Sequence, residues 1–135
     1  SMVTDLKDAL DAAIVRLKTD DGAPLELVNA VFDAFAEGGA GRLAAWIALS
    51  GDLSHLEPVR QAVQDLVAAV QEKMGDPSEA AQKRIGSGIL FIAMSAFGDA
   101  LIGPPVRDML GKGEDGTRKV VALLLPHLFD NPSLK

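Results

Sequence analysis

The stretch GILFIAMSAFGDALIGPP, residues 88–105, restricts the fold of this chain more than any other feature. It is apolar on every side of a helix, yet one acid, Asp99, lies near its end and two prolines close it. The uncharged run around it, Ile85 to Gly98, has 14 residues, whereas a membrane span needs about 18 or more. We therefore predict a buried helix of a soluble, cytoplasmic protein.

Three apolar faces run along this predicted helix. The first face is Ile85, Ile89, Ile92 and Ala96, the second is Gly88, Phe91, Ser95, Gly98 and Ile102, and the third is Leu90, Met94, Phe97 and Leu101. A chain of 135 residues has difficulty covering all three with its own side chains. A two-fold, self-complementary interface would supply the missing cover, and the small residues on the helix would allow a second helix to approach closely.

The rest of the chain favours helices over strands. Alanine, leucine and valine supply most of its apolar mass, and aromatic residues make up only 4 %, a composition that favours helix. Spacing, prolines and glycines predict helices over the ranges 4–20, 24–37, 42–50, 58–74, 77–102, 106–110 and 117–129. The predicted fold class is all-α, a six- to seven-helix orthogonal or up-down bundle.

We expect one domain, because no internal repeat or long linker divides the chain. Residues 3–131 form this domain, residues 1–2 are interpreted as the remnant of a purification tag, and residues 132–135 as a tail.

The ends of the two long C-terminal helices carry specific signals. Asp76 is the predicted N-cap of helix 77–102, with Pro77 at its first position and Glu79 reaching back as in a capping box. Gly103-Pro104-Pro105 is predicted to end that helix. Pro126 should kink the last helix or end its regular part, since its ring clashes with the carbonyl of residue 122.

Charge and cysteine content exclude several functions. Acidic residues number 19 against 13 lysines and arginines, for a net charge of −6, and such a surface repels phosphate backbones. We therefore predict no direct contact with DNA. The absence of cysteine removes disulfides, thiolate catalysis and cysteine metal sites.

No motif in the sequence indicates catalysis. The two histidines, His55 and His127, lack the spacing of a metal site, and the serines lack a nucleophile-elbow context. The loop 111–117 is not a phosphate-binding loop, because lysine does not follow Gly116 and two acids occupy the loop. We predict no enzyme activity, no metal and no cofactor.

Aromatic and sulfur-bearing side chains are candidates for the wall of an apolar ligand pocket between facing helices. The predicted pocket residues are Phe32, Phe35, Trp46, Leu49, Phe91 and Met94. Ordinary core packing is the alternative for each of them. Helix 42–50 is apolar around most of its circumference, so we expect neighbours to enclose it.

Asp99 is the one acid within the apolar helix. Its carboxylate must reach solvent, pair with a cation such as Arg107 or Arg118, or titrate at a raised pKa. A structural ion pair or hydrogen bond is the favoured interpretation, and ligand anchoring is the alternative.

Two phrases of the sequence resemble the C-terminal domain of TetR-type transcriptional regulators. The first, RLAAWIALSG, contains Arg42, Leu43, Ala45, Trp46, Leu49, Ser50 and Gly51 of the pattern RLxAWLxLSG. The second, AFGDALIGPPVRDMLG, contains Ala96 to Leu101, Gly103, Pro104, Arg107, Leu110 and Gly111 of the pattern AFGDALFGPxLRxxLG. Nothing in residues 1–23 resembles the helix-turn-helix that such regulators carry.

The resemblance implies a homodimer in which the last two long helices pair with their copies as an intersubunit four-helix bundle, while the preceding helices enclose a small, mostly apolar effector. The expected interface residues are Ile85, Gly88, Ile89, Ile92, Ser95, Ala96, Asp99, Val121, Leu124 and Leu128. DNA would be read only through a separate domain. A dimerisation or partner-binding module without a ligand is the alternative.

Overall fold

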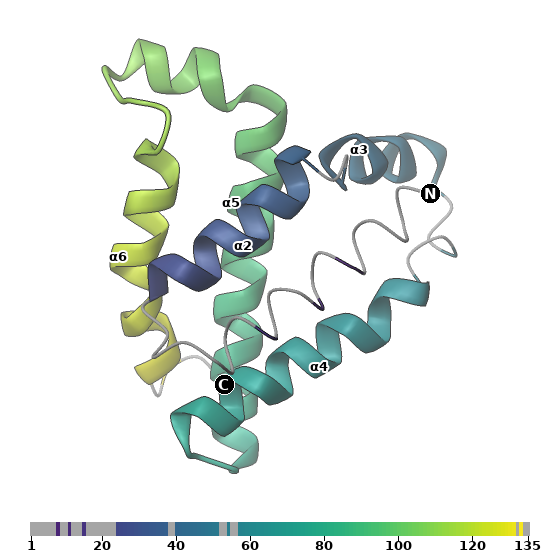
Figure 1. The fold of residues 1–135 in the computed structure, drawn as a ribbon, viewed down its shortest axis with the longest axis vertical. Helices are drawn as coiled ribbons and strands as arrows, with labels where there is room; N and C mark the ends of the chain where they lie inside the picture. The colour runs from purple at the N-terminus through teal and green to yellow at the C-terminus, as the bar shows by residue number, and fades with distance from the viewer. Residues whose placement is uncertain are drawn as a thin grey trace.

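A computed structural model describes residues 8, 11, 15, 24–37, 40–51, 54, 57–131 and 133. These residues are helical wherever they are regular, and they contain no strand (Figure 1). The helices are α2 (Pro24–Glu37), α3 (Ala40–Ser50), α4 (Glu57–Met74), α5 (Glu79–Met109) and α6 (Gly116–Asp130). The all-α class is confirmed. The predicted first helix lies almost wholly outside the described residues, so a count of six to seven helices stays a prediction.

The core forms where α2 crosses α5 and α6, which pack side by side (Figure 1). α4 packs on α5, at its lower part as seen in Figure 1, and α3 contacts α5 and α2. The core residues recur at helical spacing on α2, α4, α5 and α6, so one face of each of these four helices is buried. They are Leu27, Val28, Val31, Phe32, Ala62, Leu66, Ala69, Val70, Ile85, Ile92, Ala96, Val121 and Leu125.

Glycines end two helices as the sequence predicts. Gly51 follows α3 with φ +73° and donates its N–H to the carbonyl of Ile47 at 2.9 Å. Gly75 follows α4 with φ +72° and donates to Gln71 at 3.1 Å. An L side chain is strained in this left-handed conformation, so glycine is the favoured residue there.

The start of α5 differs from the prediction by two residues. Ser78, not Asp76, is the N-cap, because the Ser78 hydroxyl accepts the N–H of Ala81 at 3.1 Å. Asp76 instead accepts the N–H of Ser78 at 3.0 Å in a turn before the helix. Aspartate and serine are both favoured N-cap residues. Here Pro77 lies within the turn between Asp76 and Ser78, and α5 begins after that turn, at Glu79.

The end of α5 also differs, because the helix continues through Pro104 and Pro105 to Met109. Figure 1 shows the helix bending near this point, so that its last part runs across toward the start of α6. The prolines disrupt the helix as expected, but they produce a bend instead of an end. The predicted helix 106–110 is therefore the last part of α5, and we call residues 104–110 the arm.

The arm ends in a Schellman motif. The N–H of Lys112 donates to the carbonyl of Arg107 at 2.8 Å, and the N–H of Gly111 donates to that of Asp108 at 3.1 Å. Gly111 takes the left-handed conformation, φ +68°, that this motif requires. The chain then turns directly into α6, which passes through Pro126 and ends at Asp130.

Candidate functional site

Asp99 lies in a polar network that holds the bend of α5. Its Oδ1 atom accepts hydrogen bonds from Arg107 Nη1, on the arm, and from Thr117 Oγ1, in the first turn of α6, the latter at 2.6 Å. The Asp99 side chain is 16 % exposed and that of Arg107 is 15 % exposed. The predicted ion pair is therefore confirmed, with Arg107 as the partner, and it ties the two parts of α5 to each other and to α6.

Gly103 makes this network possible. It is buried, and a Cβ atom at this position would collide with the side chains of both Asp99 and Arg107. Asp99, Gly103 and Arg107 are spaced by four residues, which places them on one helix face. That spacing is the signal that could have predicted the role of Gly103 from the sequence.

Two further arginines join helices that are distant in the sequence. Arg118 on α6 donates to Asp33 on α2 at 2.7 Å, and its guanidinium lies 5.4 Å from the centre of the Phe32 ring, a cation–π distance. Arg84 on α5 donates to the carbonyl of Phe129 on α6 at 2.9 Å. The arginines 84, 107 and 118 thus stabilise the α2–α5–α6 unit, and sequence reasoning missed the roles of Arg84 and Arg118.

The six predicted pocket residues differ in their burial. Phe32 is buried in the core, and Phe35 and Phe91 pack against the core from its edge. Trp46, Leu49 and Met94 are exposed, Leu49 by 89 %. The expectation that neighbours enclose α3 is wrong for Trp46 and Leu49, and among the α3 side chains that the structure describes, residues 45–50, Ile47 is the buried one.

An open hollow of about 430 Å³ lies elsewhere, at the turn between α4 and α5. Its lining residues are Ala68, Gln71, Glu72, Gly75, Asp76 and Pro77. It shares no residue with the predicted pocket.

Hydrogen bonds from the hydroxyl and the N–H of Ser78 lower the pKa of Asp76 below its ordinary value of 3.8, and the positive charge of Arg84 lowers it further.

Four predicted interface residues lie inside the chain's own core. Ile85 and Ile92 are 0 % exposed, and Ala96 and Val121 are nearly as buried. Gly88 is also buried, because the Phe129 ring fills the space beside it. The prediction that these residues meet a second chain is therefore corrected: the faces of α5 and α6 that carry them pack against helices of the same chain.

The remaining predicted interface residues are more accessible. Leu124 is exposed, whereas Ile89, Ser95 and Leu128 are partly buried. Asp99 belongs to the polar network described above. Of the ten predicted interface residues, only Leu124 is therefore an exposed apolar side chain.

A different set of large apolar side chains on α5 and α6 is exposed, and we call this set the outer face. On α5, Leu90, Met94 and Leu101 recur half a turn from the buried residues, so they lie opposite the core. On α6, residues 120, 123 and 124 are exposed with similar spacing. The outer face comprises Leu90, Met94, Leu101, Ile102, Val120, Leu123 and Leu124.

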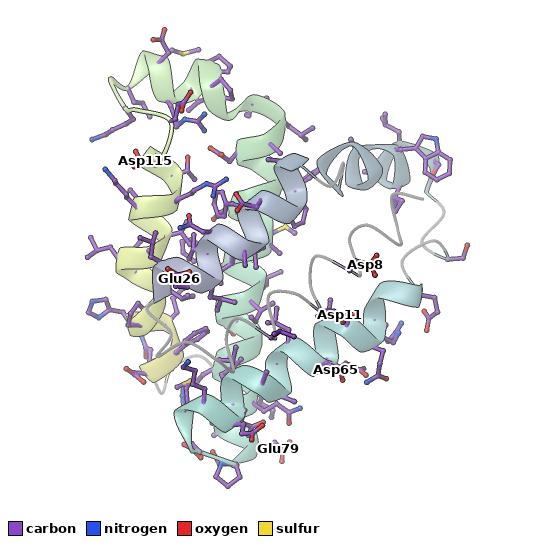
Figure 2. The ribbon with its side chains drawn as sticks, viewed as in Figure 1. Asp8, Asp11, Glu26, Asp65, Glu79 and Asp115 are labelled. Carbon is purple, nitrogen blue, oxygen red and sulfur yellow. The ribbon has the colours of Figure 1, made fainter. Side chains whose placement is uncertain are left out.

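The described residues show no arrangement typical of catalysis. No group of three or more histidine and acidic side chains among them could hold a metal ion. Figure 2 shows Glu26, Glu79 and Asp115 far apart, on α2, at the start of α5 and at the start of α6. His127 is exposed, and His55 lies outside the described residues.

α5 is long and apolar enough to cross a membrane. The 14-residue length of the uncharged run does not exclude a membrane span, because α5 continues past Asp99 and the prolines to Met109. This is weak evidence for a membrane span, since a core helix meets the same criterion. Here one side of α5 packs against α2, α4 and α6.

No family model matches this chain, and no curated protein or solved structure is measurably similar to it. The resemblance to the C-terminal domain of TetR-type regulators therefore stays a prediction from the two phrases.

Proposed function

We propose that this chain is a helical homodimerisation domain that pairs through the outer face of α5 and α6. The observation that supports the proposal is the exposure of seven large apolar side chains on two neighbouring helices. An apolar surface of this extent is typical of an interaction site. A partner that covers it would remove each side chain from water, and each fully buried leucine or isoleucine contributes about 1.5 to 3 kcal/mol.

A second copy of the chain is the partner that fits this face. α5 and α6 pack against each other and both carry exposed apolar residues, so the pair would form half of a four-helix bundle, and a two-fold axis would supply the other half. Gly98 is partly exposed, with open space beside its backbone. A helix from the second copy could therefore approach closely at that point.

The resemblance to TetR-type regulators supports the same partner, since their C-terminal domain dimerises through its last two long helices. In such a regulator the C-terminal domains would set the spacing of the two DNA-reading domains. A ligand would change that spacing if it bound one conformation of the dimer more tightly than the other. The effector remains a prediction from that resemblance, and three of the six predicted pocket residues, Trp46, Leu49 and Met94, are exposed in the single chain.

Light scattering after size-exclusion chromatography tests the dimer directly. We expect a mass of about 28 kDa, twice the 14.1 kDa of one chain, at micromolar concentration. Leu123→Glu, at a residue 71 % exposed on α6, should yield a folded monomer because it places a charge at the centre of the interface. Leu49→Glu, on the exposed side of α3, is the matched control and should leave the dimer intact.

Two results would overturn the proposal. The first is a wild-type mass of one chain at tens of micromolar. The second is an unchanged dimer for Leu123→Glu, because the dimer would then use another surface. Circular dichroism of each variant establishes that its helices are intact.

A further inference from the structure

The arm of α5 is held against the rest of the chain mainly by one side chain. Of its seven residues, 104–110, six are exposed and only Arg107 is partly buried. The loop that follows, residues 111–115, is exposed throughout. Residues 104–115 therefore contain a single side chain that is not exposed to solvent.

Arg107 binds a carboxylate that the straight part of α5 supplies. Its Nη1 atom donates to Asp99 Oδ1, and the same oxygen accepts the hydroxyl of Thr117 on α6. Both charged side chains are largely buried. Hydrogen bonds that involve charged groups are roughly twice as strong as neutral ones. We call Asp99, Arg107 and Thr117 the latch.

The local sequence does little to keep the arm helical. Pro104 and Pro105 donate no backbone hydrogen bond, so the helical ladder is interrupted where the arm begins. Val106 and Asp108 are weak helix formers, and an isolated helix shorter than about 12 residues is marginal in water. The side chain of Met109 is 78 % exposed, so it adds little burial energy.

The hydrophobic core does not depend on the arm. No residue between Ala96 and Val121 belongs to the core, and in Figure 1 the arm stands at the top of the view, beyond α2. Loss of the arm's structure would therefore leave the contacts of the core in place. Proteins open locally in this way where few buried apolar contacts hold a segment.

We infer that the arm is an order–disorder element: residues 104–112 are helical while Arg107 binds Asp99, and they melt when that contact is broken, while the core stays folded. The inference goes beyond the proposed function, because it concerns the single chain and not its dimer. Ordering of a segment by one charged contact is a known form of conformational switch.

Gly103 makes the latch sensitive to a small change. A Cβ atom there would collide with the side chains of both Asp99 and Arg107, so Gly103→Ala should separate them. Alanine favours helix over glycine. The substitution should nevertheless melt the arm, because the lost ion pair outweighs the gain in propensity.

Nuclear magnetic resonance of the full chain tests the inference. In the wild type, residues 106–110 should have helical Cα chemical shifts, and their amides should exchange at least about tenfold more slowly than those of an unstructured peptide. In Asp99→Asn the same shifts should take coil values and the amides should lose this protection. Amides of residues 85–96 should stay protected by at least about a thousandfold, because the core remains folded.

Asp108→Asn is the matched control, since it makes the same chemical change at an exposed position of the arm. It should leave the shifts and the amide protection as in the wild type. Asp99→Ala combined with Arg107→Ala removes the pair without leaving a partly buried charge unpaired. This double variant should melt the arm as Asp99→Asn does.

Three results would overturn the inference. An arm that keeps its helical shifts and its amide protection in Asp99→Asn is held by something other than the latch. An equal loss of protection in the arm and in residues 85–96 would show that the arm opens only when the whole chain unfolds. An arm that is already unprotected in the wild type would show that the latch does not order it.

Discussion

Gly88 is the position where the packing of α5 on α6 can be measured most directly. A Cβ atom added there would overlap the ring of Phe129. At Gly86, two residues earlier on the same helix, such a Cβ would have no side chain and no atom of another element within 4 Å, apart from its own chain neighbours. Gly88→Ala and Gly86→Ala therefore make the same chemical change in two environments.

The two substitutions should change stability in opposite directions. Alanine in a helix interior is favoured over glycine by about 1 kcal/mol, and Gly86→Ala should gain most of that. Gly88→Ala gains the same propensity but forces the Phe129 ring to move, at a cost of about 1 to 3 kcal/mol for overpacking. The gain in helix propensity is the same in both variants and cancels when their free energies of unfolding are subtracted. The difference therefore gives the cost of packing the new methyl group against Phe129 directly.

Urea denaturation followed by circular dichroism measures both variants, and thermal unfolding should separate their Tm values by roughly 3 to 5 °C per kcal/mol for a chain of this size. Phe129→Leu in the Gly88→Ala background should restore part of the loss, because the smaller side chain leaves room for the new methyl group. If Gly88→Ala is as stabilising as Gly86→Ala, the contact between α5 and α6 at this point is refuted.

Two further predictions concern carboxylates. Asp99→Asn should lower the free energy of unfolding by about 2 kcal/mol, because it removes the charge that Arg107 and Thr117 contact. The midpoints of urea denaturation measure this loss, with Asp65→Asn on the exposed face of α4 as the control. Equal midpoints for the two variants would contradict the prediction. Asp76 titrates below its ordinary pKa of 3.8 in the folded chain because of its hydrogen bonds to Ser78, so its contribution to stability is present above that pH and is lost as the pH falls through the lowered value. Wild type should therefore lose more stability than Asp76→Asn below about pH 4, and parallel losses would show that the Asp76 pKa is not lowered on folding.

The sequence predicted best those features that depend on local chemistry. Pro24, Gly51 and Gly75 mark helix ends because their effect on the backbone is the same in any fold. The pairing of Asp99 with Arg107 was among the stated possibilities, since a carboxylate in an apolar helix needs a cation. In each case one or two residues near in sequence determine the structure.

Features that depend on packing between helices could not be predicted from local sequence chemistry. The sequence shows that α5 is apolar on three faces, but it does not show which face the same chain covers, so Ile85 and Ile92 were assigned to a partner while Leu90 and Leu123 were not. The bend at Pro104 was taken for a helix end, because the contacts of Arg107 and Thr117 that hold the arm come from residues beyond it. Burial is decided by the arrangement of α2 and α6, which no local pattern contains.

The two prolines at the bend also determine how the backbone meets a partner. Pro104 and Pro105 have no amide hydrogen, so the carbonyl oxygens of Ala100 and Leu101 lack their usual donor four residues later. Both residues are exposed, and water can serve these oxygens in the single chain. A second subunit that buries Leu101 must supply donors of its own or enclose water at this point, so the apolar surface should contain one hydrated site beside the bend.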